Sequence, residues 1–275
     1  MTEIERSKWP PPEDDAMLPW YKGVFDAGFI ALHPFFTVEG LDPSACVHGT
    51  MVFARSEMPE GASLLEWMDE EGAARREGKE VQSGSMPGIA KGFGRPIGWG
   101  KILATLGMND HCMLDCALRT DIKGLRKEFA DEVAARRLTD YCAREKIFLP
   151  TEGVIQPLME ASLIAMLRRA GISEVILSNE FGDEERLMPL DALEDEEPWD
   201  LRDDLPKWGV RRIIAPDRSL LVWVHWDSFY TAIFGTRARL EAARPEEGFE
   251  GFWCTPATTT YWLLEEAVPL AGGRV

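Results

Sequence analysis

The stretch VRRIIAPDRSLLVWVHW, residues 210–226, contains two apolar segments separated by a turn signal. Pro216 stands where a type I turn prefers proline, and Asp217 and Arg218 complete the short connection. Segments rich in Val, Ile, Leu and Trp that are joined in this way are typical of a β-hairpin. We therefore predict two adjacent antiparallel strands here.

A second hairpin is predicted before the first one. EVILSNEF at 174–181 and ERLMPL at 185–190 have strand composition and flank Gly182-Asp183, a dipeptide that favours tight hairpin turns. Far upstream, ALHPFF at 31–36 also has strand composition, but Pro34 restricts it to a sheet edge or a turn.

Helical signals separate and follow these strands. QPLMEASLIAMLRRAG at 156–171 has Pro157 in its first turn and Gly171 just past its end, which is the usual order of helix punctuation. A helix is predicted at 63–77, where Ser63 and Glu66 form a capping box.

Two more helices are predicted from apolar spacing. One covers about 122–145, and another begins at about 228 with Asp227 or Ser228 as its N-cap. The apolar stripe of the first comprises Leu125, Phe129, Val133, Leu138 and Tyr141. The fold class expected from all these segments is α+β, with an antiparallel sheet built mainly from the C-terminal half, helices packed on it, and a mostly helical N-terminal half.

Composition limits the class of protein further. Of the 275 residues 45% are hydrophobic, including 10 Trp, which argues against a disordered chain. No apolar run reaches about 18 residues, so no membrane span is expected. The N-terminus lacks the pattern of a signal peptide, and five cysteines without a close-set framework suit a reduced cytoplasm. We expect a cytoplasmic protein, while the sequence carries no signal for its oligomeric state.

The charge is strongly negative and unevenly placed. The formal net charge is −17 with a pI near 4.7, which does not favour nucleic acid or anionic lipid as a partner. Between Asp183 and Asp204 there are 11 acidic residues and 2 arginines, so this segment supplies over half of the net charge. It is either a solvated loop or a docking surface that attracts a basic protein.

The segment KGFGRPIGWGKI at 91–102 resembles a phosphate-binding loop only superficially. A Walker A loop would need glycine at Arg95 and a hydroxyl at Ile102, and a dinucleotide fingerprint would need glycine at Ile97. The segment nevertheless lies in a window, residues 81–109, that contains no acidic residue.

This basic window leaves two interpretations open. Its cations and glycine amides could bind a phosphate or carboxylate, or its glycines allow tight backbone while its apolar side chains anchor it to the core. The candidate ligand-binding residues are Lys91, Gly92, Gly94, Arg95, Lys101 and, from outside the window, His225.

No catalytic or metal motif is complete. His225, Asp227 and Ser228 are too close in sequence to form a catalytic triad readily. His111 and Asp115, like Cys112 and Cys116, are i, i+4 pairs in a helix, but zinc needs three or four ligands and no second cluster has matching spacing. We therefore predict no metal and no cofactor.

Several motifs resemble those of an uncharacterised bacterial family, domain of unknown function 2711. They are ALHPFF at 31–36, PIGWGKILATLGM at 96–108, IFLPTEG at 147–153 and WDSFYTAIFG at 226–235. The family has no assigned activity, so the resemblance implies none here. It implies one globular domain, expected over 19–275, because residues 1–18 are rich in proline and charge and are expected to form a tail. The residues that the resemblance carries over include Pro96, Trp99, Asp227, Ser228, Phe229 and Thr231.

Two functions of different classes follow. We favour a non-catalytic interaction protein that binds a basic macromolecular partner, as immunity or antitoxin proteins do. The alternative is a small-molecule enzyme or ligand-binding protein whose anionic ligand is held by residues 91–101, with chemistry from His225 or His111. A scaffold subunit is a third class that the sequence does not separate from the first.

Overall fold

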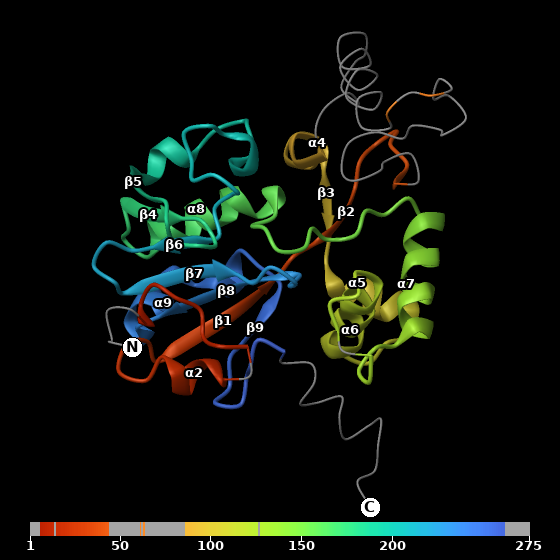
Figure 1. Cartoon of the computed structure of the whole chain (residues 1–275), viewed down its shortest axis with the longest axis horizontal. Helices are drawn as coiled ribbons and strands as arrows, with labels where there is room; N and C mark the ends of the chain where they lie inside the picture. The colour runs from red at the N-terminus through yellow and green to blue at the C-terminus, as the bar shows by residue number, and fades with distance from the viewer. Residues whose placement is uncertain are drawn as a thin grey trace, which may run out of the picture.

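A computed structural model describes residues 6–13, 15–43, 61, 63, 86–125 and 127–261. Its centre is a seven-stranded sheet in the order β5-β4-β6-β7-β8-β1-β9, in which every neighbouring pair is antiparallel (Figure 1). The strands are β1 (Ala27–Leu32), β4 (Glu174–Ser178), β5 (Glu185–Pro189), β6 (Arg212–Ile214), β7 (Leu220–Val224), β8 (Tyr230–Gly235) and β9 (Gly251–Trp253).

Both predicted hairpins are confirmed. In one, β4 pairs with β5, and in the other β6 pairs with β7, so that Ile213 lies opposite Val222. Arg218 closes the second turn with a left-handed φ of 62°, and its N–H donates to the carbonyl of Ala215 at 2.9 Å. The turn residues therefore set the register, and the strands extend from it.

The helix predicted from about 228 is wrong, because residues 230–235 form strand β8 in the middle of the sheet. All of β8 is buried, since helices cover both faces of the sheet at this point. A strand covered on both faces is apolar at consecutive positions, so the alternation that identifies a strand in sequence is missing.

The capping role predicted for Asp227 or Ser228 is wrong for the same reason. The helix that follows the strand is α9 (Arg237–Ala243), and its cap is Thr236, whose hydroxyl accepts from Arg239 N–H at 3.3 Å. Ser228 instead donates its hydroxyl to the carbonyl of His225 at 2.8 Å in the turn before β8.

The N-terminal half supplies strands as well as helices, so the expectation of a mostly helical half is met only in part. β1 lies between β8 and β9, and Pro34 separates it from β2 (Phe35–Thr37). β2 pairs with β3 (Arg95–Ile97) in a second, two-stranded sheet. The α+β class and the concentration of strands in the C-terminal half are confirmed.

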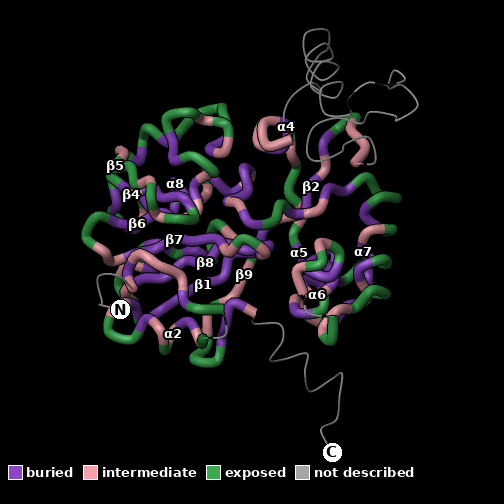
Figure 2. The backbone as a smooth tube through the Cα atoms, in the orientation of Figure 1, coloured by how far each residue is buried: buried purple, intermediate pink, exposed green. Residues whose placement is uncertain are grey.

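Helices cover the large sheet on both faces (Figure 1). Leu221 and Trp223 of β7 pack with α2, α5, α6 and α7, whereas Leu220 and Val222 pack with α8 and α9. Figure 2 shows the resulting buried interior along β1, β7 and β8. The remaining helices are α2 (Met17–Trp20), α4 (Met86–Phe93), α5 (Trp99–Leu106), α6 (His111–Asp121), α7 (Glu132–Arg144) and α8 (Glu160–Arg169).

Two helix predictions have different outcomes. The helix at 156–171 is confirmed as η3 (Pro157–Met159) followed by α8, with Gly171 left-handed just after it. The helix at 122–145 is half wrong: α7 begins only at Glu132, capped by Asp131, and Val133 of the supposed apolar stripe is 79% exposed. The helix at 63–77 lies outside the described residues. In the described parts of the chain, none of the helices has the length and apolar character to cross a bilayer.

Candidate functional site

The acidic segment forms one edge of the large sheet together with the loops beside it. We call residues 183–208 the acidic face. It comprises β5, η4 (Leu190–Leu193), η5 (Trp199–Leu201) and the turn that leads to β6. β5 is the edge strand: it pairs with β4 on one side, and on the other no strand among the described residues covers its backbone. An exposed strand edge offers N–H and C=O groups to another chain.

Some carboxylates of the acidic face have cations of their own. Arg168 of α8 pairs with Asp191 at 2.5 Å and also with Glu194, and Arg202 pairs with Asp204 at 2.6 Å. These pairs lie at the surface, where such an ion pair contributes only about 0–1 kcal/mol. They fix local geometry more than they stabilise the fold.

Other carboxylates of the acidic face form no ion pair with the described residues, although the charge of Arg202 acts on Asp195 and Glu197. Asp195, Glu196, Glu197 and Asp203 are exposed, and no lysine or arginine among the described residues forms an ion pair with them. Their negative charges point to water, so this part of the surface attracts cations over a distance of about 10 Å at moderate salt.

Trp208 stands out on this face because its ring is 77% exposed while its backbone is held in an unfavourable conformation. Its φ is 70°, a left-handed value that is rare for a bulky residue, and Gly209 follows with φ 83°. The preceding residue is anchored just before β5, since the N–H of Lys207 donates to Glu184 Oε2 at 3.0 Å. Backbone strain of this kind is found most often at binding sites.

A shallow hollow of about 320 Å³ lies beside Trp208. Its lining includes the carboxylates of Asp200 and Asp203, and also Lys207 and Arg202, of which Arg202 is paired with Asp204. Burial raises the pKa of Asp200, and the nearby Arg211 opposes this shift. An aromatic face next to carboxylates is a favourable environment for a lysine or arginine side chain, which gains both ion pairing and cation–π attraction.

Exposed apolar side chains accompany the charge. Phe181, in the turn between β4 and β5, is 66% exposed, and Leu187 of β5 is 62% exposed. Aromatic and apolar anchors among polar groups are typical of protein interfaces.

The predicted anion-binding segment 91–101 is not a loop. It comprises the end of α4, the strand β3 and the start of α5. The N–H groups of Trp99 and Gly100 each donate to the carboxylate of Glu250 at 2.7 Å. A Cβ atom at Gly98 would lie 2.4 Å from Glu250 Oε2, so the absence of a side chain there lets the carboxylate approach. The amides of this segment therefore hold an anion that belongs to the chain itself.

The electrostatics of this carboxylate agree with its contacts. The pKa of Glu250 is lowered, chiefly by His111 and then by the two amides at the N-terminus of α5. His111 Nε2 lies 3.8 Å from Glu250 Oε1. His111 thus sits beside an internal carboxylate, at the point where α6 begins.

The candidate ligand-binding residues are dispersed. Lys91 Nζ pairs with the buried Glu160 at 2.6 Å, and Arg95 pairs with Glu39 at 2.8 Å on the surface. Lys101 lies exposed on α5.

The two glycines are explained locally. Gly92 is exposed in α4, and an added Cβ would meet nothing there. Gly94 donates its N–H to the carbonyl of Ala90 at 2.9 Å, and a Cβ would lie 2.4 Å from that same oxygen. Anion binding by these residues stays a prediction.

His225 belongs to a separate cluster at the end of β7. Its Nδ1 accepts from the N–H of Asp227 at 3.3 Å, so Nε2 carries the proton and donates to Glu13 Oε1 at 3.2 Å. Tyr261 donates its hydroxyl to the other oxygen of Glu13, also at 3.2 Å. Burial and then the charge of Arg119 lower the pKa of His225, so its ring is held neutral.

Two charged features were missed from the sequence. The first is the ion pair of Asp115 and Arg119, 2.7 Å apart, in which neither side chain is exposed. The i, i+4 spacing that drew attention to His111 and Asp115 also holds for Asp115 and Arg119, and this second pairing is the one that forms. In the described part of the chain, no three His, Cys, Asp or Glu side chains are arranged to hold a metal ion.

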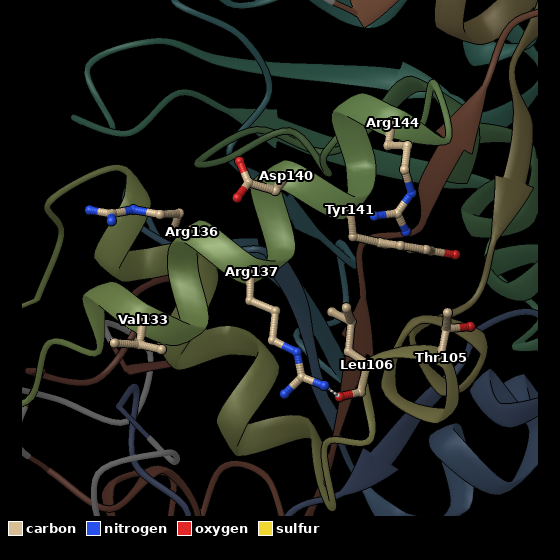
Figure 3. Close-up of a pocket in the computed structure, with 8 residues that line it drawn as sticks. All are labelled: Thr105, Leu106, Val133, Arg136, Arg137, Asp140, Tyr141 and Arg144. Atoms are coloured by element: carbon tan, nitrogen blue, oxygen red, sulfur yellow. Dashed lines mark hydrogen bonds between the residues drawn. The ribbon is translucent and has the colours of Figure 1, made fainter.

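The second missed feature is a groove of about 500 Å³ between α5 and α7 (Figure 3). Arg136, Arg137 and Arg144 line it together with Thr105, which lies one turn after Lys101. Figure 3 shows Arg137 reaching across to the carbonyl of Leu106, to which it donates a hydrogen bond. Arg137 and Arg144, seven residues apart, fall on one stripe of α7, which is the sequence signal that would have found them.

The fold and the charged surfaces define an α+β protein with a sheet covered on both faces. A family model described as "Protein of unknown function (DUF2711)" matches residues 86–264, which is more than half of the chain, and the chain belongs to this family. The resemblance seen in its motifs is thereby confirmed. The chain is similar to uncharacterized protein YwbB of Bacillus subtilis (strain 168), at 25% identity over 173 residues, or 62% of this chain and 74% of YwbB. No solved structure gives a significant match.

Proposed function

We propose that this chain is a non-catalytic interaction protein and that its acidic face binds a basic segment of a partner protein. The observation that carries the proposal is Trp208, which is 77% exposed in a left-handed conformation beside the carboxylates of Asp200 and Asp203. Such an arrangement offers one lysine or arginine of the partner an aromatic surface and a counter-charge together. Immunity and antitoxin proteins, which neutralise basic toxins, are the type of protein that we expect.

The expected binding has two physical components. The charge of the acidic face speeds the encounter with a cationic partner and makes its rate sensitive to salt. The contacts that slow dissociation come from the exposed apolar side chains of Phe181 and Leu187 and from the open edge of β5.

The experiment starts with the full chain as bait and the purified partner that it captures. The dissociation constant is then measured for Trp208→Ala and for the double variant Glu196→Lys/Asp203→Lys. The matched control is Glu241→Lys/Glu246→Lys, which changes the net charge equally at exposed positions of α9 and η6 (Pro245–Glu247).

We expect the acidic-face variants to weaken binding at least about tenfold and the control to change it by much less, because charge acts mainly near the contact. Binding of the wild type should weaken as salt rises from about 0.05 M to about 0.5 M. Equal losses in the control and the acidic-face variants, or indifference to salt, would exclude this function.

The groove between α5 and α7 favours a second candidate function, the binding of an anionic small molecule. Its guanidinium groups, from Arg136, Arg137 and Arg144, have the geometry that recognises phosphates and carboxylates. Thermal-shift screening with nucleotides and phosphorylated sugars tests it, since a ligand at 100 times its dissociation constant stabilises by about 2.7 kcal/mol. The shift must be lost in Arg144→Ala and kept in Arg95→Ala, because Arg95 lies outside the groove, although each of these guanidinium groups pairs with a glutamate of the chain.

A further inference from the structure

A second cavity, of about 500 Å³, opens on another part of the molecule, where β2, α4 and the segment 148–154 meet η5. Its floor is aromatic, because the rings of Phe36 and Phe148 stack with their centres 4.9 Å apart and their planes inclined by 10°. Ala90 and Pro157 add apolar walls. The cavity is therefore shaped for a small ligand with an apolar body.

Two carboxylates line this otherwise apolar cavity. They belong to Asp200, in η5, and to Glu152, at the end of the segment that carries Phe148. Among the described residues, no hydrogen-bond donor reaches either carboxylate, although burial raises the pKa of both groups. Asp200 is half-buried without a donor from the described residues, which is unusual for a carboxylate in a folded protein, whereas Glu152 is exposed.

The cavity walls are held in place by a buried ion pair. Glu160 of α8 accepts from Lys91 Nζ of α4 at 2.6 Å and from the N–H of Trp199 in η5 at 3.0 Å. The carboxylate of Glu160 thus links α8, which directly follows Pro157 and η3, to α4 with Ala90 and to η5 with Asp200. Because these walls are fixed in advance, a ligand would lose little affinity to ordering them.

We propose that this cavity binds a small organic cation, an ammonium group on an apolar or aromatic body. The ammonium group pairs with Asp200 and Glu152, and the apolar body packs against Phe36 and Phe148. Carboxylates disfavour an anion here, which distinguishes this site from the arginine groove between α5 and α7.

This site goes beyond the docking function proposed above, and variants separate the two. Asp200 lines both this cavity and the hollow beside Trp208, whereas Glu152 lines only the cavity and Trp208 only the hollow. Glu152→Gln should therefore affect the small cation alone, and Trp208→Ala the protein partner alone.

The test uses three probes of one shape that differ in charge: benzylamine, benzyl alcohol and benzoate. Binding to the full chain is measured by calorimetry and by protein-detected NMR titration at neutral pH. Benzylamine is expected to bind saturably in the millimolar range, at least about tenfold tighter than the other two, as suits a fragment of this size. Glu152→Gln and Asp200→Asn should each weaken it at least about fivefold, while Asp203→Asn, at an exposed carboxylate outside the cavity, leaves it unchanged.

Three outcomes would overturn the proposal. These are the absence of saturable benzylamine binding, binding of benzoate or benzyl alcohol as tight as that of benzylamine, and equal weakening by Asp203→Asn. Circular dichroism of Glu152→Gln shows whether that variant is folded. If it is not folded, Phe148→Leu serves as the second variant, because it removes the aromatic stack and keeps an apolar side chain. This variant should also weaken the binding of benzylamine.

Discussion

The carboxylates that are bound within the fold of this protein and those of the acidic face meet opposite conditions. Asp115, Glu160 and Glu250 each accept hydrogen bonds from a cation or an amide of the chain itself. Glu196 and Asp203 on the acidic face have no such partner among the described residues. The acidic residues behind the net charge of −17 therefore form two populations. One population maintains the fold, and the other is available to a partner.

The largest change in stability is expected at the ion pair of Asp115 and Arg119, which is fully buried. Arg119→Met leaves the Asp115 carboxylate buried without its cation, and we expect the free energy of unfolding to fall by about 3–5 kcal/mol. Urea denaturation followed by tryptophan fluorescence measures this loss.

The double variant Asp115→Leu/Arg119→Met is the matched control for that measurement. It removes both charges and keeps apolar volume, so it should recover a large part of the loss. A loss below about 1 kcal/mol in Arg119→Met would mean that the pair is not part of the population that maintains the fold.

The next largest effect concerns pH and two buried groups whose pKa values move in opposite directions. Burial raises the pKa of Glu160 from 4.5 to about 7, against the opposing effect of Lys91. Burial lowers the pKa of His33 from 6.5 to about 4; its ring accepts from Thr231 and donates to the carbonyl of Thr151.

The signs of these shifts determine how stability changes with pH. Folding favours the protonated form of Glu160, so its contribution is full below pH 4.5 and is lost as pH rises through about 7. Folding favours neutral His33, so its contribution is full above pH 6.5 and is lost as pH falls through about 4. Each slope is about 1.4 kcal/mol per pH unit, and the two nearly cancel between pH 4.5 and 6.5.

We therefore expect Glu160→Gln to uncover the slope that belongs to His33. Its free energy of unfolding should fall by about 1.4 kcal/mol per unit as pH drops from 6.5 toward 4.5, whereas that of the wild type stays comparatively flat. Urea denaturation at pH 6.5, 5.5 and 4.5 provides the slopes. Parallel curves for the two proteins would contradict the prediction, whatever constant offset the variant introduces.

A smaller effect is expected at Glu250, which accepts two hydrogen bonds at the N-terminus of α5 while its side chain stays exposed. Glu250→Ala removes the acceptor of two helix N–H groups and should cost about 1 kcal/mol, as loss of a cap does. Sulfate or phosphate should then raise the melting temperature of the variant more than that of the wild type, because the vacated amides can bind the anion. Glu246→Ala, at an exposed residue of η6, is the control and should show neither effect.

The segment around Glu250 also shows how far the sequence could predict the site. The absence of acidic residues over 81–109 and its glycines led to the prediction of an anion-binding place, and binding of an external anion there stays a prediction. The anion that the structure places there is Glu250, about 150 residues further along the chain, and no local pattern could indicate it. Lys91 is similar, because its partner Glu160 lies on a different helix.

The fold was predictable where elements are defined locally. Both hairpins and the helix at 156–171 carry turn and cap residues beside their apolar segments, and all three are confirmed. The prediction of β8 failed because burial on both faces removes the alternation of apolar and polar residues. Only the last residues of β1 were included in the predicted strand segment, because the pairing of β1 with β8 joins distant parts of the chain. Trp208 was not singled out, since its exposure depends on how the turn before β6 is anchored just before β5.

The smallest effect on stability is expected where the effect on binding is largest. Glu196→Lys/Asp203→Lys changes exposed side chains that form no ion pair with described residues, so the free energy of unfolding should stay within about 0.5 kcal/mol of the wild type. Reversing these charges removes local repulsion among carboxylates, so we expect slight stabilisation at low salt. Surface substitutions rarely lower the free energy of unfolding by more than about 2 kcal/mol. A larger loss would mean that these two residues belong with the carboxylates that maintain the fold, and it would contradict the division into two populations.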